Sequence, residues 1–303
     1  MTSCFAEATH SLTSYWTDAR MNVRGPKWPW QRTAGYALLL SMSMLITDFP
    51  TYAGVHCQGT HSQGALPLQG TAMRAGLQGQ QLEIMVAQAS GAPVRMDVLS
   101  FRGDKVLVRE HESPSSEVRE ASELEGATWS AESCNAEGTC QEIAYRIARV
   151  MRDASINTMI EHSNNSDVPL YEIEYAVLTS PTPTDWRSVC DGDAGPTAGL
   201  FVDGRWHDDG SREDGGYTFS CLDGVIAKCV RGWGYKPWKT LTSDEHGEVS
   251  LAPLHQMCTR AARADYCGDG NAHTRDGTEV DIVDGYGFNV RDERRQFTAE
   301  SGF

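Results

Sequence analysis

Hydrophobic and polar residues alternate between positions 82 and 108, which is the pattern of β-strands. Two runs with period two, Leu82–Ala87 and Val94–Leu99, are bounded by Gly, Pro and Ser. A turn at Arg102–Gly103–Asp104 separates the second run from a third, Lys105–Val108. This alternation predicts antiparallel hairpins with one buried face. The charged, Ser-rich segment 110–125 predicts a loop or a short helix.

Further strands are predicted in the second half of the chain. The segment 142–152 fits either a strand or an amphipathic helix, and period alone does not decide between them. Its neighbour Tyr171–Val177 alternates clearly, so we favour a strand for both. Leu200–Trp206 and Gly216–Ser220 flank a polar, Gly-containing segment and predict another hairpin.

Two short helices are predicted after residue 221. The first has one apolar face, and Gly232 is placed to end it in the left-handed conformation. The second has Pro253 in its first turn and an apolar stripe typical of a surface helix. The apolar positions are Val225, Ile226, Cys229 and Val230 in the first helix, and Leu254, Met257, Cys258 and Ala261 in the second.

The N-terminal segment has the pattern of an export signal. Residues 33–46 are apolar, have a basic flank, and are too few for the ~20 residues of a membrane-spanning helix. We expect cleavage after Ala53 and a true start at Met21. We expect no lipid on Cys57, because Val55 and His56 precede it where a lipidation site has small residues.

Charge and cysteine content limit the class of protein. The formal charge of −15 argues against nucleic acid and anionic membrane surfaces as partners, because both require a basic face. The nine cysteines include no CxxC pair, so disulfides in an oxidising compartment are favoured over a metal site. The sequence therefore predicts a periplasmic, outer-envelope or extracellular protein without a transmembrane span after cleavage.

Three motifs carry a resemblance to a known family. GVIAKCV at 224–230, GYKPW at 234–238 and ADYCGDG at 264–270 resemble the ADYC domain of bacterial, chiefly myxobacterial, envelope proteins. The resemblance covers about 141–297 and implies that the strand at 142–152 pairs with the one at 171–177. Family members continue into a further strand with Trp and Cys, so the resemblance implies either an unpaired last strand or a truncated tail here.

The fold class that follows is α+β. Antiparallel β elements lead into a disulfide-linked C-terminal region with two short helices. The expected divisions are a leader at 1–53, a Gln-Gly-rich linker at 54–80, a β-rich part at 81–140, an ADYC-like domain at 141–297 and a tail at 298–303.

The positions of the cysteines limit their pairing. Cys134 and Cys140 bracket a short loop and predict a local disulfide. Two cysteines eight residues apart on one helix are ~12 Å apart, beyond the ~7 Å limit for a bridge. We therefore predict bonds between elements. The expected pairs are Cys229 with Cys258, and Cys267 with Cys221 or Cys190. Because the family members have a further Cys in the end that is missing here, the resemblance implies that one cysteine lacks a partner, and we expect this to be Cys57.

Two sets of residues are candidates for a functional site. Trp233, Tyr235 and Trp238 form either an aromatic binding shelf or the cover of a small core. His273 with Asp276 or Asp281 is a weak candidate for a hydrolytic site, although no nucleophile motif accompanies it.

Metal sites are weaker interpretations, and we expect no cofactor. A zinc set competes with disulfides, and two acidic groups miss the spacing of a calcium loop. The zinc set is His255, Cys258, Cys267 and His273; the calcium sets are Asp191 with Asp193, and Asp269, Asn271, Asp276 and Asp281. The function that the sequence favours is a non-catalytic envelope or secreted module that binds protein or polysaccharide. A secreted hydrolase is the alternative.

Overall fold

The structure is a computed structural model of the 303-residue chain. It describes residues 20–23, 68, 77–87, 91–134, 138–154, 165–178, 183–190, 198–207, 210–244, 246–265, 268, 271, 279–283 and 297–298, and in 20–23, 279–283 and 297–298 it describes the backbone alone.

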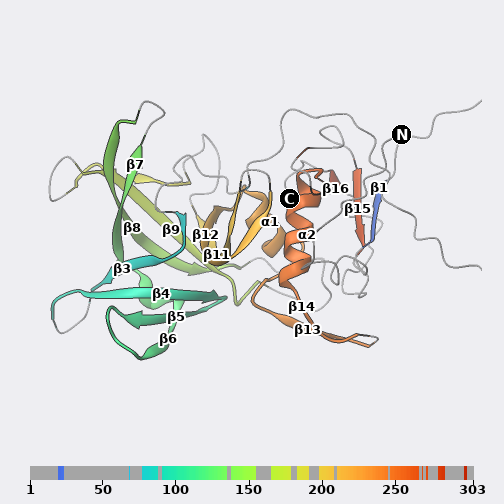
Figure 1. The fold of residues 1–303 in the computed structure, drawn as a ribbon, viewed down its shortest axis with the longest axis horizontal. Helices are drawn as coiled ribbons and strands as arrows, with labels where there is room; N and C mark the ends of the chain where they lie inside the picture. The colour runs from blue at the N-terminus through green and yellow to red at the C-terminus, as the bar shows by residue number, and fades with distance from the viewer. Residues whose placement is uncertain are drawn as a thin grey trace, which may run out of the picture.

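The described part of the chain is dominated by one antiparallel sheet of eleven strands (Figure 1). Its order is β2-β12-β11-β9-β8-β7-β3-β4-β5-β6, and β10 adds to β9 beside this path. The strands are β2 (Gln78–Gly79), β3 (Leu82–Val86), β4 (Val94–Arg102), β5 (Lys105–Glu110), β6 (Ser116–Glu120), β7 (Thr128–Cys134), β8 (Cys140–Arg152), β9 (Pro169–Val177), β10 (Arg187–Ser188), β11 (Gly199–Trp206) and β12 (Arg212–Cys221). A 3₁₀ turn, η1 (Ala121–Leu124), connects β6 to β7.

The remaining elements follow β12 or pair with the chain's end. Two helices, α1 (Val225–Arg231) and α2 (Ala252–Ala262), flank the hairpin of β13 (Thr240–Ser243) and β14 (Gly247–Ser250). A small sheet has the order β1-β15-β16, from Arg20–Val23, Glu279–Val283 and Phe297–Thr298. The β1 strand lies within the predicted leader, so cleavage after Ala53 would remove the strand that pairs with β15.

The predicted strands are confirmed. The segment 142–152 belongs to β8, a strand that pairs with β7 on one side and β9 on the other. β7 and β8 belong to one sheet, so the sheet runs across position 140, where we expected the ADYC-like domain to begin. The segment 110–125, expected as a loop or helix, contains both β6 and η1.

Both predicted helices are present, and one detail differs. All four residues of the predicted stripe of α2 are buried. Gly232 caps α1, but its φ of −81° is right-handed rather than left-handed. The left-handed residue is Gly234, with φ of 82°, so the chain reverses two residues later than expected.

The sheet curls until β4 lies against β11, although several strands separate them in the sheet order. Phe101 of β4 stacks on Phe201 of β11 with ring centroids 4.5 Å apart. The Asp203 carboxylate accepts hydrogen bonds from the Phe101 backbone N–H and the Ser100 hydroxyl, each at 2.7 Å. A bulge in β4 between Val98 and Ser100 bends the strand at this point. The inner faces of the strands therefore enclose one apolar core.

A second core lies on the other face of β11. Because strand side chains alternate, Phe201 points into the first core while Leu200 and Val202 point into the second. Helix α1 covers this outer face with Val225 and Ile226, which are fully buried. Figure 1 shows α1 between β11–β12 and α2. The molecule is thus mostly antiparallel β with two short helices, which fits α+β broadly.

Three disulfides are present among the described residues. Cys134–Cys140 closes the β7–β8 hairpin, and Cys229–Cys258 joins α1 to α2, as predicted. Cys190 bonds to Cys221, which corrects the prediction that one of these two pairs with Cys267. Cys267 and Cys57 themselves lie outside the described residues.

Candidate functional site

The predicted aromatic shelf is not on the surface. Trp233 is 5% exposed and Tyr235 is fully buried, so neither offers a ring face to a ligand. Trp238 is partly buried against the second core, and its indole lies beside the Gly103 turn, where a Cβ would come within 2.6 Å of Nε1. The alternative, in which these side chains cover a core, fits all three residues, and the prediction of an exposed binding shelf is wrong.

The described residues do not test whether the predicted hydrolytic residues lie close together. His273 and Asp276 lie outside the described residues, and Asp281 is described only as a backbone position in β15, opposite Asn22. Of the zinc set, Cys258 is bonded to Cys229 and His255 is buried against α1, so these two do not form a thiolate–imidazole pair. The calcium sets lie outside the described residues apart from an exposed Asn271 and the Asp281 backbone.

The family motifs around α1 supply ion pairs that hold the sheet to the helices. Lys236 of GYKPW pairs with Asp167, just before β9. Arg231, the last residue of α1, pairs with Asp153 through Nε at 2.5 Å and Nη2 at 3.3 Å. Asn165 Nδ2 donates to the Arg231 carbonyl at 2.9 Å. These five residues form a largely buried polar cluster that holds the sheet and the helices together.

The first residues of the ADYC motif end helix α2. Ala264 has φ of 58°, an uncommon left-handed conformation for a non-glycine residue. Asp265 is 1% exposed, and its backbone N–H donates to the Arg260 carbonyl at 2.9 Å. Its carboxylate lies 4.0 Å from the Arg260 guanidinium. Ala264 and Asp265 therefore form the structural end of a helix.

A different group of residues has the chemistry of a site, and sequence reasoning missed it. Glu83, Asp97 and Arg109 come from β3, β4 and β5 and lie directly opposite one another in the ladder. His111 follows β5, and its N–H donates to the Arg95 carbonyl at 2.9 Å, which prolongs the same ladder. We call these five residues the outer-face cluster, because the alternate positions of the same strands point into the core.

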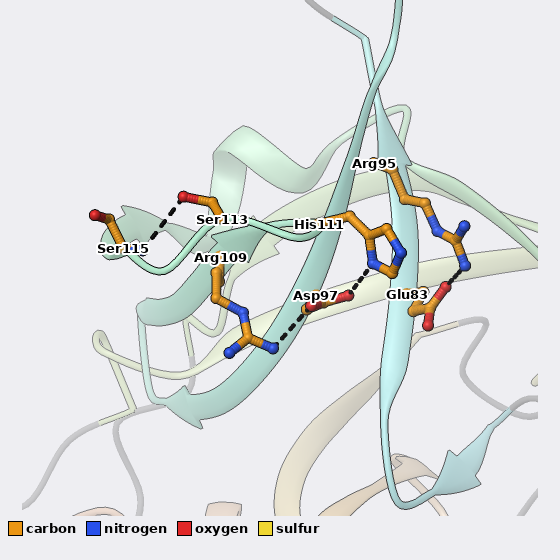
Figure 2. Close-up of polar contacts among 7 residues, drawn as sticks. All are labelled: Glu83, Arg95, Asp97, Arg109, His111, Ser113 and Ser115. Carbon is orange, nitrogen blue, oxygen red and sulfur yellow. Dashed lines mark hydrogen bonds and ion pairs between the residues drawn. The ribbon is translucent and has the colours of Figure 1, made fainter.

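The carboxylate of Asp97 is the centre of the outer-face cluster (Figure 2). Its Oδ1 lies 3.0 Å from His111 Nδ1, and its Oδ2 accepts from Arg109 at 2.9 Å. The Asp97 side chain is only 3% exposed, whereas that of His111 is 32% exposed. Figure 2 also shows Glu83 paired with Arg95 beside it. The buried Asp97 carboxylate is therefore flanked by the partly exposed side chains of His111 and Glu83.

Electrostatics keep Asp97 ionised. Burial acts to raise the pKa of its carboxyl, but hydrogen bonds from His111, Arg109 and Gln81 outweigh burial and hold the pKa below its usual range. One ligand atom from each of Glu83, Asp97 and His111 lies within 4.8 Å of the other two. The arrangement provides two carboxylates and one imidazole at metal-binding separations.

The signal for this cluster was present in the sequence but weak. Asp97 is a polar position in the alternating strand β4, and His111 directly follows the next strand. Their proximity depends on the register of β4 with β5, which the bulge in β4 shifts. A polar residue on a strand's outer face is the ordinary pattern of a half-exposed sheet, so the alternation alone gave no reason to single it out.

Comparison with known proteins identifies part of the chain. The family model of the ADYC domain matches residues 121–303. No curated protein and no solved structure matches the chain. The match includes the buried polar cluster and both helices, while β3, β4 and β5, which carry the outer-face cluster, precede it.

Proposed function

The chain belongs to the ADYC domain family, and on that premise we propose that it is an exported, non-catalytic module of the cell envelope or secreted space that binds protein or polysaccharide. The observation that carries this proposal is the disulfide bracing of the described fold. Cys190–Cys221 ties β12 to the segment after β10, and Cys229–Cys258 ties the two helices. Such bonds persist in oxidising compartments and are rare in the cytosol.

The apolar leader supports the same proposal from the sequence. Residues 33–46 form the run expected of a signal peptide, with basic residues before it. In the part of the chain that the structure describes, no helix combines the length and the apolar character needed to cross a membrane. Export followed by cleavage near Ala53 is consistent with both observations.

The non-catalytic part of the proposal rests on how buried polar groups are used. Lys236, Asp153 and Arg231 are committed to ion pairs between layers, and His255 Nε2 lies 3.0 Å from the Ile226 carbonyl. Groups held in this way stabilise a scaffold and are not placed to attack a substrate.

The outer strand β6, with Glu117 and Arg119 paired on it, has the charged edge that protects a sheet from indiscriminate pairing.

Export is tested by producing the full chain in a bacterium that has an envelope. We expect the mature protein outside the cytoplasm, a new N-terminus near residue 54, and the bonds Cys190–Cys221 and Cys229–Cys258 in peptide maps made without reduction. An uncleaved cytoplasmic chain with these four thiols free would refute the proposal.

Binding is tested with the mature, oxidised protein immobilised next to a reduced and alkylated copy. Envelope extract is divided into a protease-treated fraction, which retains glycans, and a glycan-depleted protein fraction. We expect one fraction to supply a component that the oxidised copy retains and the alkylated copy does not. Equal retention by both copies, or retention by neither, would contradict a folded binding module.

A further inference from the structure

We infer that Glu83, Asp97 and His111 form a binding site for a divalent transition-metal ion of the zinc type. The inference is independent of the proposed function, because it rests on side chains of β3, β4 and the residue that follows β5. The three residues are joined by strand register and lie within 4.8 Å of one another through their ligand atoms.

The donor set suits such an ion. Zinc takes imidazole nitrogen and carboxylate oxygen at about 2.0–2.2 Å, and sites open to solvent have three protein ligands. Two donors around one such ion are then about 3–3.5 Å apart. His111 Nδ1 and Asp97 Oδ1 are 3.0 Å apart, so they fit one ion without movement of the backbone.

The position of Asp97 adds rigidity to the set. Arg109 holds its Oδ2, which leaves Oδ1 directed at His111. A partner that fixes one oxygen of a ligating carboxylate orients the other, as outer-shell groups do in metal sites. The His111 backbone is fixed as well, because its N–H is bonded to the Arg95 carbonyl and the chain turns immediately after it, with Glu112 at φ of 64°.

Arg95 is the competitor for the site. Its guanidinium pairs with Glu83, but its side chain is 52% exposed, so it is free to turn toward water. A metal ion that recruits Glu83 must displace Arg95. This competition gives the inference a distinctive consequence: removal of the Arg95 charge should tighten metal binding, which no purely structural role of the cluster predicts.

The test is calorimetric titration of zinc chloride alone into the tag-free, oxidised chain. We expect a site that His111→Ala and Glu83→Gln weaken at least about tenfold, and that Arg95→Gln strengthens. His207→Ala is the matched control, because His207 is also exposed and lies 3.5 Å from a carboxylate, that of Glu213. It should leave the affinity unchanged.

Circular dichroism of each variant checks that the fold is retained, since all the substituted side chains are partly exposed. The inference is overturned if submillimolar zinc produces no binding, or if His111→Ala and Glu83→Gln bind as the parent does. Loss of binding in His207→Ala alone would also overturn it, because the ion would then lie at His207.

Discussion

Lys236 Nζ lies 2.5 Å from Asp167 Oδ1, although the lysine side chain is completely buried and that of Asp167 is one quarter exposed. Lys239 approaches the other oxygen of the same carboxylate at 2.8 Å. Burial lowers the pKa of Lys236, although its bond to Asp167 acts in the opposite direction. The lysine of the GYKPW motif is therefore held mainly by the carboxylate of Asp167, just before β9.

Asp167→Asn is expected to destabilise the fold strongly. The substitution removes the carboxylate that hydrogen-bonds the buried Lys236 ammonium, and breaking a buried pair from one side costs about 3–5 kcal/mol. Lys236→Met should cost less, because Asp167 keeps Lys239 and its contact with water. Urea unfolding of both variants measures the difference.

The matched control for this pair is Asp185→Asn. Asp185 is 78% exposed and pairs with Arg187 on the surface, where such a pair contributes about 0–1 kcal/mol. Equal losses for Asp167→Asn and Asp185→Asn would show that Lys236 does not rely on the pair.

The two disulfides that were predicted correctly should differ in their contribution. Cys229 and Cys258 are 29 residues apart, whereas Cys134 and Cys140 are 6 apart. In the chain-entropy model the longer loop stabilises by about 4 kcal/mol and the shorter one by about 2 kcal/mol. Double Cys→Ala variants of each pair, compared by urea unfolding, should reproduce this order. A larger loss of unfolding free energy on removal of Cys134–Cys140 than of Cys229–Cys258 would contradict this order.

The pattern of apolar positions in the sequence was sufficient for features that a single strand or helix determines. The alternation at Leu82–Ala87 and Lys105–Val108 predicted hairpins because half of a strand's side chains face the core. The apolar stripes of the two helices brought Cys229 and Cys258 to facing surfaces, so their bond was also predictable.

Tertiary arrangement decided the rest. Cys190 and Cys221 meet because β12 ends beside the segment after β10, which no local pattern encodes. Trp233 and Tyr235 follow α1 and are buried, although their spacing along the chain does not show whether they face solvent. Asp97 and His111 meet through the register of β4 with β5. Each of these contacts depends on packing between residues far apart in the sequence, which the periodicity of apolar positions does not reveal.

Asp203 should be important for stability, because it joins β11 to β4 where the curled sheet brings these two strands together. Asp203→Ala removes the acceptor of the Phe101 N–H, and an unsatisfied buried donor costs about 1–3 kcal/mol. Asp203→Asn retains an oxygen at that position and should lose less. Ser100→Ala, which removes only the hydroxyl donor, is the control. If all three variants unfold at the same urea concentration, the Asp203 carboxylate does not stabilise the contact between β4 and β11.

His255 should make stability depend on pH between about 4 and 6.5. It is fully buried between the helices, and burial lowers its pKa from 6.5 to about 4, although its bond to the Ile226 carbonyl opposes the change. The unfolded chain therefore binds a proton in this window and the folded chain does not. Stability is complete above 6.5 and falls as the pH is lowered toward 4, by about 3 kcal/mol in all.

His255→Gln should flatten this dependence, because glutamine does not titrate and its amide retains a donor for the Ile226 carbonyl. Although burial acts to raise it, the pKa of the Asp97 and Asp167 carboxyls is lowered by hydrogen bonds, which moves their titration away from this window. Burial raises the pKa of the Asp203 carboxyl, so its protonation acts in the opposite direction. The difference between the parent and His255→Gln therefore isolates the imidazole. Urea unfolding at pH 7 and at pH 4.5 measures the effect, with the exposed His207→Ala as control. A parent chain equally stable at both pH values, or a His255→Gln variant with the parent's full slope, would show that the buried imidazole does not set the acid response.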